Sequence, residues 1–175
     1  MTTRNKATPV ARKRSFAPVA DARTILLILG SLPGELSLAQ SQYYANPQNR
    51  FWRLMSEVTA IDLAAMAYDA RLQALQQQGI GLWDVVAEAH RSGSLDSNIR
   101  ERDDNDLATL VAGLPKLTTI AFNGGTAARI GLKNLGNVAQ HYDIFKLPSS
   151  SPAYTLAYAE KLTAWSALKT ALVNK

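Results

Sequence analysis

The strongest constraint on the fold of this chain is a repeated alternation between short apolar runs and longer segments with helical spacing. The apolar runs are short and rich in leucine, β-branched or aromatic residues, which is typical of strands. They cover residues 24–30, 79–86, 117–125 and 142–148. Helical patterns cover residues 47–58, 69–79, 106–114, 126–136 and 158–173. This order predicts an α/β fold, a three-layer sandwich with a central, mainly parallel four-stranded sheet flanked by helices.

In sheets of this kind the ligand binds at the carboxyl ends of the strands. Four loops follow the four predicted strands, and we therefore expect a functional site where they meet. These loops are residues 30–34, the region of Trp83 and Asp84, residues 122–125 and residues 147–154. The polar stretch 87–105 is expected to be a loop as well, because it has no apolar periodicity.

Composition excludes several kinds of chemistry. The 175 residues are 47% hydrophobic, enough for a real core, and no run approaches the ~20 apolar residues of a membrane span. Together with an N-terminus that lacks an apolar signal core, this predicts a cytoplasmic protein without a membrane partner. The chain has no cysteine and only two histidines, His90 and His141, so we expect no disulfide, metal or other cofactor.

The net charge of +5 is concentrated at the N-terminus. Residues 1–20 hold five basic side chains and no acid, and the remaining residues hold 14 basic and 14 acidic side chains. The basic side chains are Arg4, Lys6, Arg12, Lys13 and Arg14. This pattern predicts a basic, flexible tail over residues 1–20 and a single domain over residues 21–175. The tail is either a solvated terminus or an arm that follows DNA.

The segment 30–52 is dense in turn-forming residues, amides and aromatics. Gly30 and Gly34 bracket Pro33, so that the backbone can approach a ligand closely and its N–H groups can bind an anion or a carbonyl oxygen. The same pattern is common in purely structural turns. It is neither a phosphate-binding P-loop nor a dinucleotide fingerprint.

This segment resembles the active-site motif of the uracil-DNA glycosylase superfamily. The matching positions are Gly30, Pro33, Gly34, Ala45, Pro47, Asn49, Phe51 and Trp52. Leu32 stands where the mismatch-specific uracil and thymine glycosylases have a catalytic asparagine. The hypoxanthine-DNA glycosylase group is similar in this respect, and its catalytic asparagine falls at Asn49. Later segments, including residues 93–99 and 147–153, extend the resemblance to about residue 170.

The resemblance implies a monofunctional DNA glycosylase domain over residues 21–175, which hydrolyses the N-glycosidic bond of a flipped-out, deaminated base. Hypoxanthine in double-stranded DNA is the expected substrate, with single-stranded DNA left open and a monomer as the expected state. Two alternatives remain open. The first is a uracil, xanthine or mismatch-specific glycosylase of the same superfamily. The second is a noncatalytic nucleic-acid-binding module.

The resemblance also implies roles for individual residues. Asn49 positions the attacking water, and the alternative for it is a helix cap. Tyr44 stacks on the base, and Asp84 accepts a hydrogen bond from a ring N–H unless it is only a capping residue. Asn123 binds the departing base or simply forms a turn. The full set expected at the base is Gly30, Ser31, Leu32, Pro33, Gly34, Tyr44, Asp84 and Asn123.

The loop after the fourth predicted strand is expected to enter the DNA duplex and fill the gap left by the flipped nucleotide. It consists of Pro148, Ser149, Ser150, Ser151 and Pro152. Serine hydroxyls and backbone amides would bind phosphates there. The main uracil-DNA glycosylases have a histidine in this loop, which this chain lacks. Without the resemblance, a polar turn between two prolines would be the preferred interpretation.

Overall fold

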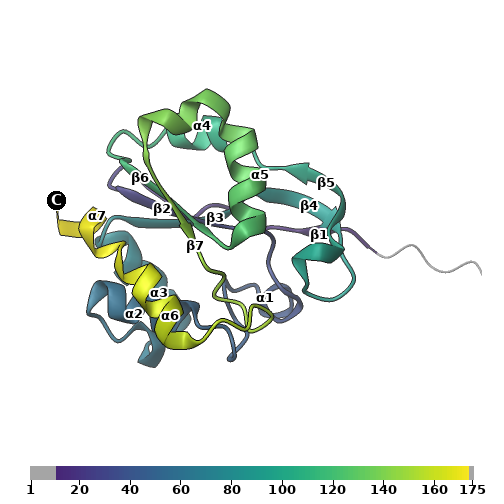
Figure 1. Cartoon of the computed structure of the whole chain (residues 1–175), viewed down its shortest axis with the longest axis horizontal. Helices are drawn as coiled ribbons and strands as arrows, with labels where there is room; N and C mark the ends of the chain where they lie inside the picture. Colours follow the sequence, from purple (N-terminus) through teal and green to yellow (C-terminus); the bar gives the residue numbers. More distant parts are fainter. Residues whose placement is uncertain (1–10, 174–175) are drawn as a thin grey trace, which may run out of the picture.

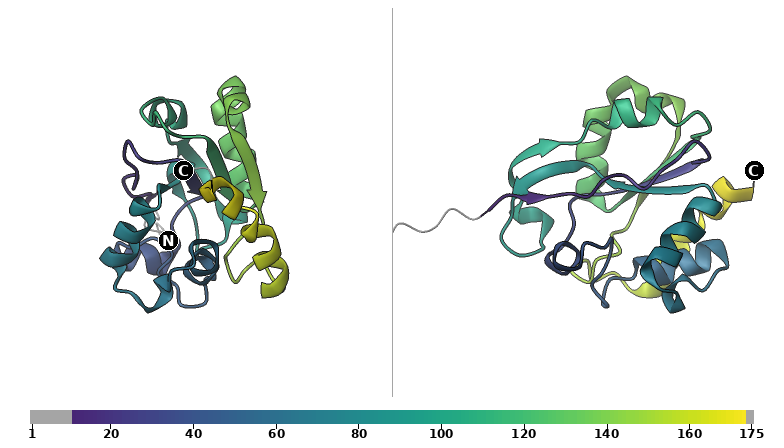
Figure 2. Two further views of the ribbon diagram at one scale, coloured as in Figure 1. Left: turned by 90° about the vertical axis from the view of Figure 1, so that its left-hand side faces the viewer. Right: turned by 180° about the vertical axis from the view of Figure 1, so that it is seen from behind.

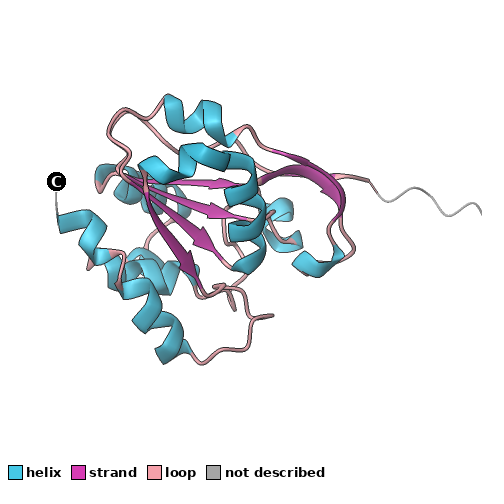
Figure 3. Cartoon of the chain, turned by 45° about the horizontal axis from the view of Figure 1, so that its top comes forward, coloured by secondary structure: helices cyan, strands magenta, loops and turns pink. Residues whose placement is uncertain are grey.

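The computed structural model describes residues 11–173 and is built on a four-stranded, wholly parallel sheet in the order β3-β2-β6-β7. The strands are β2 (Leu26–Gly30), β3 (Ile80–Asp84), β6 (Thr119–Asn123) and β7 (Asp143–Leu147). All four arrowheads point toward the same end of the sheet (Figure 3). The predicted fold class is confirmed.

Two apolar cores, one on each face of the sheet, give the molecule its three layers. Within β2, Leu26 and Ile28 belong to one core, and Leu27 and Leu29 belong to the other, because successive side chains of a strand point to opposite faces. The first core is covered by α2 (Phe51–Thr59), α3 (Tyr68–Gln77) and α6 (Tyr158–Ser166). The second core is covered by α4 (Leu107–Ala112) and α5 (Gly125–Leu135), as Figures 1 and 2 show.

The remaining helices are short. They are α1 (Glu35–Gln40), η1 (Leu63–Ala65), η2 (Asp96–Asn98), η3 (Gly136–His141) and α7 (Lys169–Val173). The sequence pattern did not predict α1, and the single helix expected over residues 158–173 is two helices, α6 and α7. None of the helices between residues 11 and 173 has the length and apolar character to cross a membrane.

A second, antiparallel sheet in the order β1-β4-β5 was not expected. It is formed by β1 (Lys13–Arg14), β4 (Val86–His90) and β5 (Arg100–Asp104), at the right of Figure 1. The prediction of a loop over residues 87–105 was therefore wrong. The reason is that β5 has the sequence RERDD, exposed at every position, so it carries no apolar alternation from which a strand could be read.

The predicted boundary of the N-terminal tail at residue 20 was also wrong. Arg12 pairs with Glu88 on β4 and with Asp103 on β5, and Arg14 pairs with Glu88. The Phe16 carbonyl accepts a hydrogen bond from the Trp83 indole at 2.9 Å. Residues 11–20 are thus held by acidic and backbone partners that a count of local charge does not reveal. Residues 1–10 of the predicted tail lie outside the described residues.

Candidate active site

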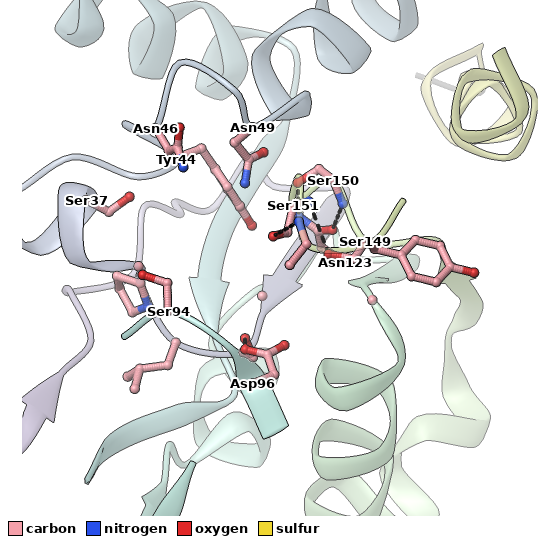
Figure 4. Close-up of a pocket in the computed structure, with 18 of the residues that line it drawn as sticks. Ser37, Tyr44, Asn46, Asn49, Ser94, Asp96, Asn123, Ser149, Ser150 and Ser151 are labelled. Atoms are coloured by element: carbon pink, nitrogen blue, oxygen red, sulfur yellow. Dashed lines mark hydrogen bonds between the residues drawn. The ribbon is translucent and has the colours of Figure 1, made fainter. Parts of the chain in front are cut away.

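A pocket of about 560 Å³ opens at the carboxyl ends of the parallel strands. All four loops that follow the predicted strands contribute to it, together with the connection between β4 and β5. Figure 4 shows the polar side chains of these segments arranged around the cavity. The structure therefore brings together all the residues expected at the base, and it adds Ser94, Leu95 and Asp96 from the β4–β5 connection. Trp83 and Pro148 do not line the pocket.

The turn over residues 30–34 is held from behind by a buried arginine. Arg91, which is 1% exposed, donates from Nη1 to the Leu32 carbonyl at 3.1 Å and from Nη2 to the Pro33 carbonyl. Its Nε donates to the Gly93 carbonyl at 3.1 Å. Burial lowers the pKa of Arg91, and nearby acidic groups oppose this effect. Sequence reasoning missed Arg91, because nothing local marks an arginine in a polar stretch as buried.

Leu32, which stands at the position of the catalytic asparagine of the mismatch-specific glycosylases, belongs to the apolar core beside α4 and α5 and is 6% exposed. It also borders the pocket, yet its side chain has no hydrogen-bonding group. Leu32 therefore supports the turn through its apolar side chain and through the carbonyl that Arg91 binds.

The connection between β4 and β5 is tied to the same turn through a carboxylate. Ser31 Oγ donates to Asp96 Oδ1 at 2.7 Å, and Arg91 Nη1 lies 4.0 Å from that oxygen. Burial raises the pKa of Asp96, while the Ser31 hydrogen bond and the Arg91 charge lower it. A second link runs from the Glu35 backbone N–H to Ser94 Oγ at 3.0 Å. These contacts make the connection a fixed wall of the pocket.

Asp84 ends β3 and lies opposite Gly30 in the parallel register. Its carboxyl group is buried, and Oδ2 has no hydrogen-bond partner among the described residues. Burial, followed by the charge of Asp96, raises the pKa of Asp84 to about 7, and Arg91 opposes this. A Cβ at Gly30 would lie 2.6 Å from Asp84 Oδ1 and 3.0 Å from the Tyr44 hydroxyl. Only glycine leaves room for these two polar groups there.

Tyr44 reaches into the pocket from the loop before α2 (Figure 4). Its backbone has a φ of 55°, in the left-handed region, which turns the side chain toward the cavity. One face of the Tyr44 ring stacks on Phe51, with ring centroids 3.8 Å apart and planes 16° apart. Burial and the charge of Asp84 raise the pKa of Tyr44. That a base stacks on this residue stays a prediction.

Asn49 lines the pocket and also supports the first turn of α2. Its Oδ1 accepts a hydrogen bond from the Phe51 backbone N–H at 2.9 Å, although the N-cap position itself is Arg50. Asn49 therefore supports the start of the helix as the capping alternative expected, but from the residue before the N-cap. The two expected roles are compatible, because a carbonyl oxygen has a second lone pair.

Asn123, at the end of β6, anchors the serine loop. Its Nδ2 donates to Ser150 Oγ at 2.8 Å, and its Oδ1 accepts from the Ser150 backbone N–H at 2.9 Å. Ser150 is 1% exposed, so in this conformation it holds the loop and does not protrude toward DNA. The structure thus corrects the expectation that Ser150 enters the duplex.

Three further hydrogen bonds hold the backbone of this loop. The Trp165 indole donates to the Pro148 carbonyl at 2.9 Å, Lys161 Nζ donates to the Ser151 carbonyl at 3.0 Å, and the Arg50 N–H donates to the Ser150 carbonyl at 3.0 Å. Burial lowers the pKa of Lys161, and the charge of Arg50 adds to this effect. Ser149, Ser151 and Pro152 line the pocket beside the exposed Tyr154.

The site combines a stacked aromatic, a buried carboxyl group and amide side chains in one pocket. It offers no group of three or more metal-ligating side chains within residues 11–173. An apolar ring face beside a few placed hydrogen-bonding groups fits a planar, polar heterocycle such as a nucleobase. The chain belongs to the uracil DNA glycosylase superfamily, whose family model matches residues 17–171. The resemblance found in the sequence is confirmed.

Similar proteins cover most of the chain. A protein of Methanosarcina acetivorans named hypoxanthine DNA glycosylase is 40% identical over 89% of this chain and 97% of its own. A protein of Methanosarcina barkeri with the same name is 36% identical over 89% and 96%. A solution NMR structure from Methanosarcina acetivorans, provisionally named a uracil DNA glycosylase, is 39% identical, with a TM-score of 0.81. It covers 93% of this chain and 99% of that chain.

Proposed function

We propose that this protein is a DNA glycosylase that hydrolyses the N-glycosidic bond of hypoxanthine in DNA. Two observations carry the proposal together. The chain shares 40% and 36% identity with two proteins of that name, and the asparagine expected to position the attacking water, Asn49, lines the pocket beside Tyr44.

Base excision requires that the nucleotide leave the stack, at an energetic cost of a few kcal/mol that the pocket must recover. The Tyr44 ring, backed by Phe51, offers a face for the extruded base. Arg91 occupies the carbonyls of Leu32 and Pro33 and so fixes this turn beside the base. A rigid turn of this kind presents its N–H groups to a departing base without reorganisation.

Asn49 would orient the attacking water toward C1′ of the deoxyribose. Because Oδ1 already accepts from the Phe51 N–H, the orientation of the amide is fixed before substrate binds. An amide is a weak base, so its contribution is to position the water near a sugar that develops positive charge.

We infer which residues enter the duplex from the exposure of the apolar side chains around the pocket. Tyr154 and Leu95 are 49% and 50% exposed, and both border the pocket. They belong to the loops that Figure 4 shows on opposite sides of the cavity, near Ser151 and Ser94. We place the wedge at Tyr154, with Leu95 pressing the duplex from the other side. Ser149 and Ser151 then remain as phosphate contacts.

The proposal is tested with duplexes that each carry one hypoxanthine, uracil or xanthine, incubated without added metal and then treated with alkali to cleave abasic sites. We expect strand cleavage at hypoxanthine in the presence of EDTA. Cleavage only at uracil or xanthine would show a glycosylase of different substrate choice. Binding without cleavage of any duplex would show a noncatalytic module.

A further inference from the structure

The buried carboxyl group of Asp84 is not used by the hydrogen bonds that hold the walls of the pocket. Its Oδ2 is buried without a partner, and Asp84 lines the pocket floor beside Gly30 and Tyr44. A buried carboxylate normally accepts two or more hydrogen bonds, because losing water is costly for a charge. A neutral carboxyl group instead needs an acceptor for its own hydrogen. The pocket therefore has the form of a site in which the ligand supplies that acceptor.

The surrounding charges favour the neutral form. The charged groups that act on Asp84 are Asp96 from η2 and Arg91 after β4, and the Asp84 charge in turn acts on Tyr43 and Tyr44 from the loop before α2. Arg91 is the one cation among them, and its guanidinium is occupied by three carbonyls. Burial raises the pKa of both tyrosines, so they stay neutral over the same range. With burial and the charge of Asp96 raising it, the pKa of Asp84 is about 7.

We propose that Asp84 is a general acid that donates its proton to N7 of the departing purine. This inference rests on the proposed function. As the bond between C1′ and N9 breaks, its electron pair moves into the purine ring and the Asp84 proton passes to N7. Water adds to C1′ and releases one proton, which restores the carboxyl group. The products are neutral hypoxanthine and an abasic deoxyribose.

The proposal also accounts for a preference for a purine over uracil. Hypoxanthine has a ring nitrogen, N7, that accepts a proton, and uracil has no ring nitrogen with a free lone pair. A general acid placed at the pocket floor therefore accelerates loss of the purine and adds little to loss of uracil. If Asp84 instead worked as a carboxylate that accepts from the N1–H of the base, the rate would depend on pH in the opposite direction.

The test measures single-turnover excision from a deoxyinosine duplex between pH 5.5 and 9. For the parent protein we expect a rate constant that falls as pH rises through about 7. Asp84→Asn should lower the rate constant at pH 6 on the order of 10²-fold, the lower end of what general acids contribute, and should remove this fall. Asp69→Asn, an exposed acid-to-amide change in α3, should keep the parental profile. Melting temperatures establish that each variant is folded.

Two further measurements keep the proposal falsifiable. Asp96→Asn retains an acceptor for Ser31 but removes the charge that raises the pKa of Asp84, so the fall in rate should move to lower pH. A 7-deazahypoxanthine substrate, which lacks N7, should be a poor substrate for the parent and no poorer for Asp84→Asn.

The outcomes separate the acid role from the proposed function. Excision that rises with pH, or an Asp84→Asn variant as active as the parent, overturns the acid role and leaves the glycosylase in place. A parent protein that excises no hypoxanthine at any pH overturns both.

Discussion

Asn123 and Ser150 are joined by two hydrogen bonds that connect the end of β6 to the loop after β7. Both residues are buried, so the pair fixes one wall of the pocket. Asn123→Ala should lower the free energy of unfolding by about 1–3 kcal/mol, because it leaves the Ser150 N–H and hydroxyl buried without partners. Urea unfolding measures this change. Ser150→Ala removes one bond and should have a smaller effect, and equal stability of all three proteins would contradict the prediction.

The replacement of Asn49 by alanine separates chemistry from folding. We expect single-turnover excision of hypoxanthine to fall on the order of 10²-fold or more, because the group that positions water is lost. The hydrogen bond to the Phe51 N–H is also lost, which should lower stability by about 1 kcal/mol. Asn49→Ser keeps an acceptor for that N–H and should recover the melting temperature without the rate. A folded Asn49→Ala protein with the parental rate would refute the assigned role.

The proposed wedge predicts a difference between duplex and single-stranded substrates. Tyr154→Ala and Leu95→Ala should each reduce excision from duplex DNA at least several-fold, because extrusion of the base then lacks an apolar group to fill the gap. Excision from a single strand should change little, since no stack has to be opened. Val173→Ala, which changes an exposed apolar residue in α7, is the matched control. Equal losses on both substrates would assign these residues to base binding instead.

The basic N-terminus is expected to contribute less to DNA binding than its charge indicates. Arg12, Lys13 and Arg14 pair with acidic side chains, which leaves Arg4 and Lys6 in residues 1–10. Deletion of residues 1–10 should lower the salt dependence of DNA affinity by about two units at most. Fluorescence anisotropy at several salt concentrations measures this slope. A much larger reduction would show that the paired arginines leave their partners when DNA binds.

Deletion of residues 1–14, compared with deletion of residues 1–10, tests whether residues 11–14 stabilise the fold. It also removes β1 and leaves Glu88 without the two arginines that pair with it. We therefore expect this longer deletion to lower the melting temperature, whereas the deletion of residues 1–10 should leave it unchanged.

Asp84 should also make stability depend on pH. Folding raises its pKa from 3.8 to about 7, so its charged form destabilises the folded state. The stability that the neutral carboxyl group contributes is fully present below about pH 4, and it is lost as pH rises through about 7. Relative to the parent, Asp84→Asn should thus gain roughly 2–3 kcal/mol of unfolding free energy between pH 5 and pH 8.5. Urea unfolding at pH 5 and pH 8.5 tests this, and a constant difference between the two proteins would contradict it.

The sequence by itself determined the class of fold and the edge of the sheet at which the site lies. Residues 26–29 are all apolar, which is typical of a strand buried on both faces, and Gly30 ends the run. Periodicity and turn chemistry are local properties, so they can be read from short windows of sequence. The motif from Gly30 to Trp52 resembles that of the superfamily, and the family model that matches residues 17–171 confirms the resemblance.

Tertiary structure alone decided which polar groups are buried and what they bind. Arg91 contacts the Leu32 carbonyl across 59 positions of sequence, and Arg12 contacts Glu88 across 76. The second sheet escaped prediction because β5 has no apolar pattern and forms by pairing with β4. In the sequence, nothing distinguishes Asp84 from any other acidic residue at the end of a strand. Its raised pKa arises because the fold removes it from water and places Asp96 near it, and no local pattern encodes either effect.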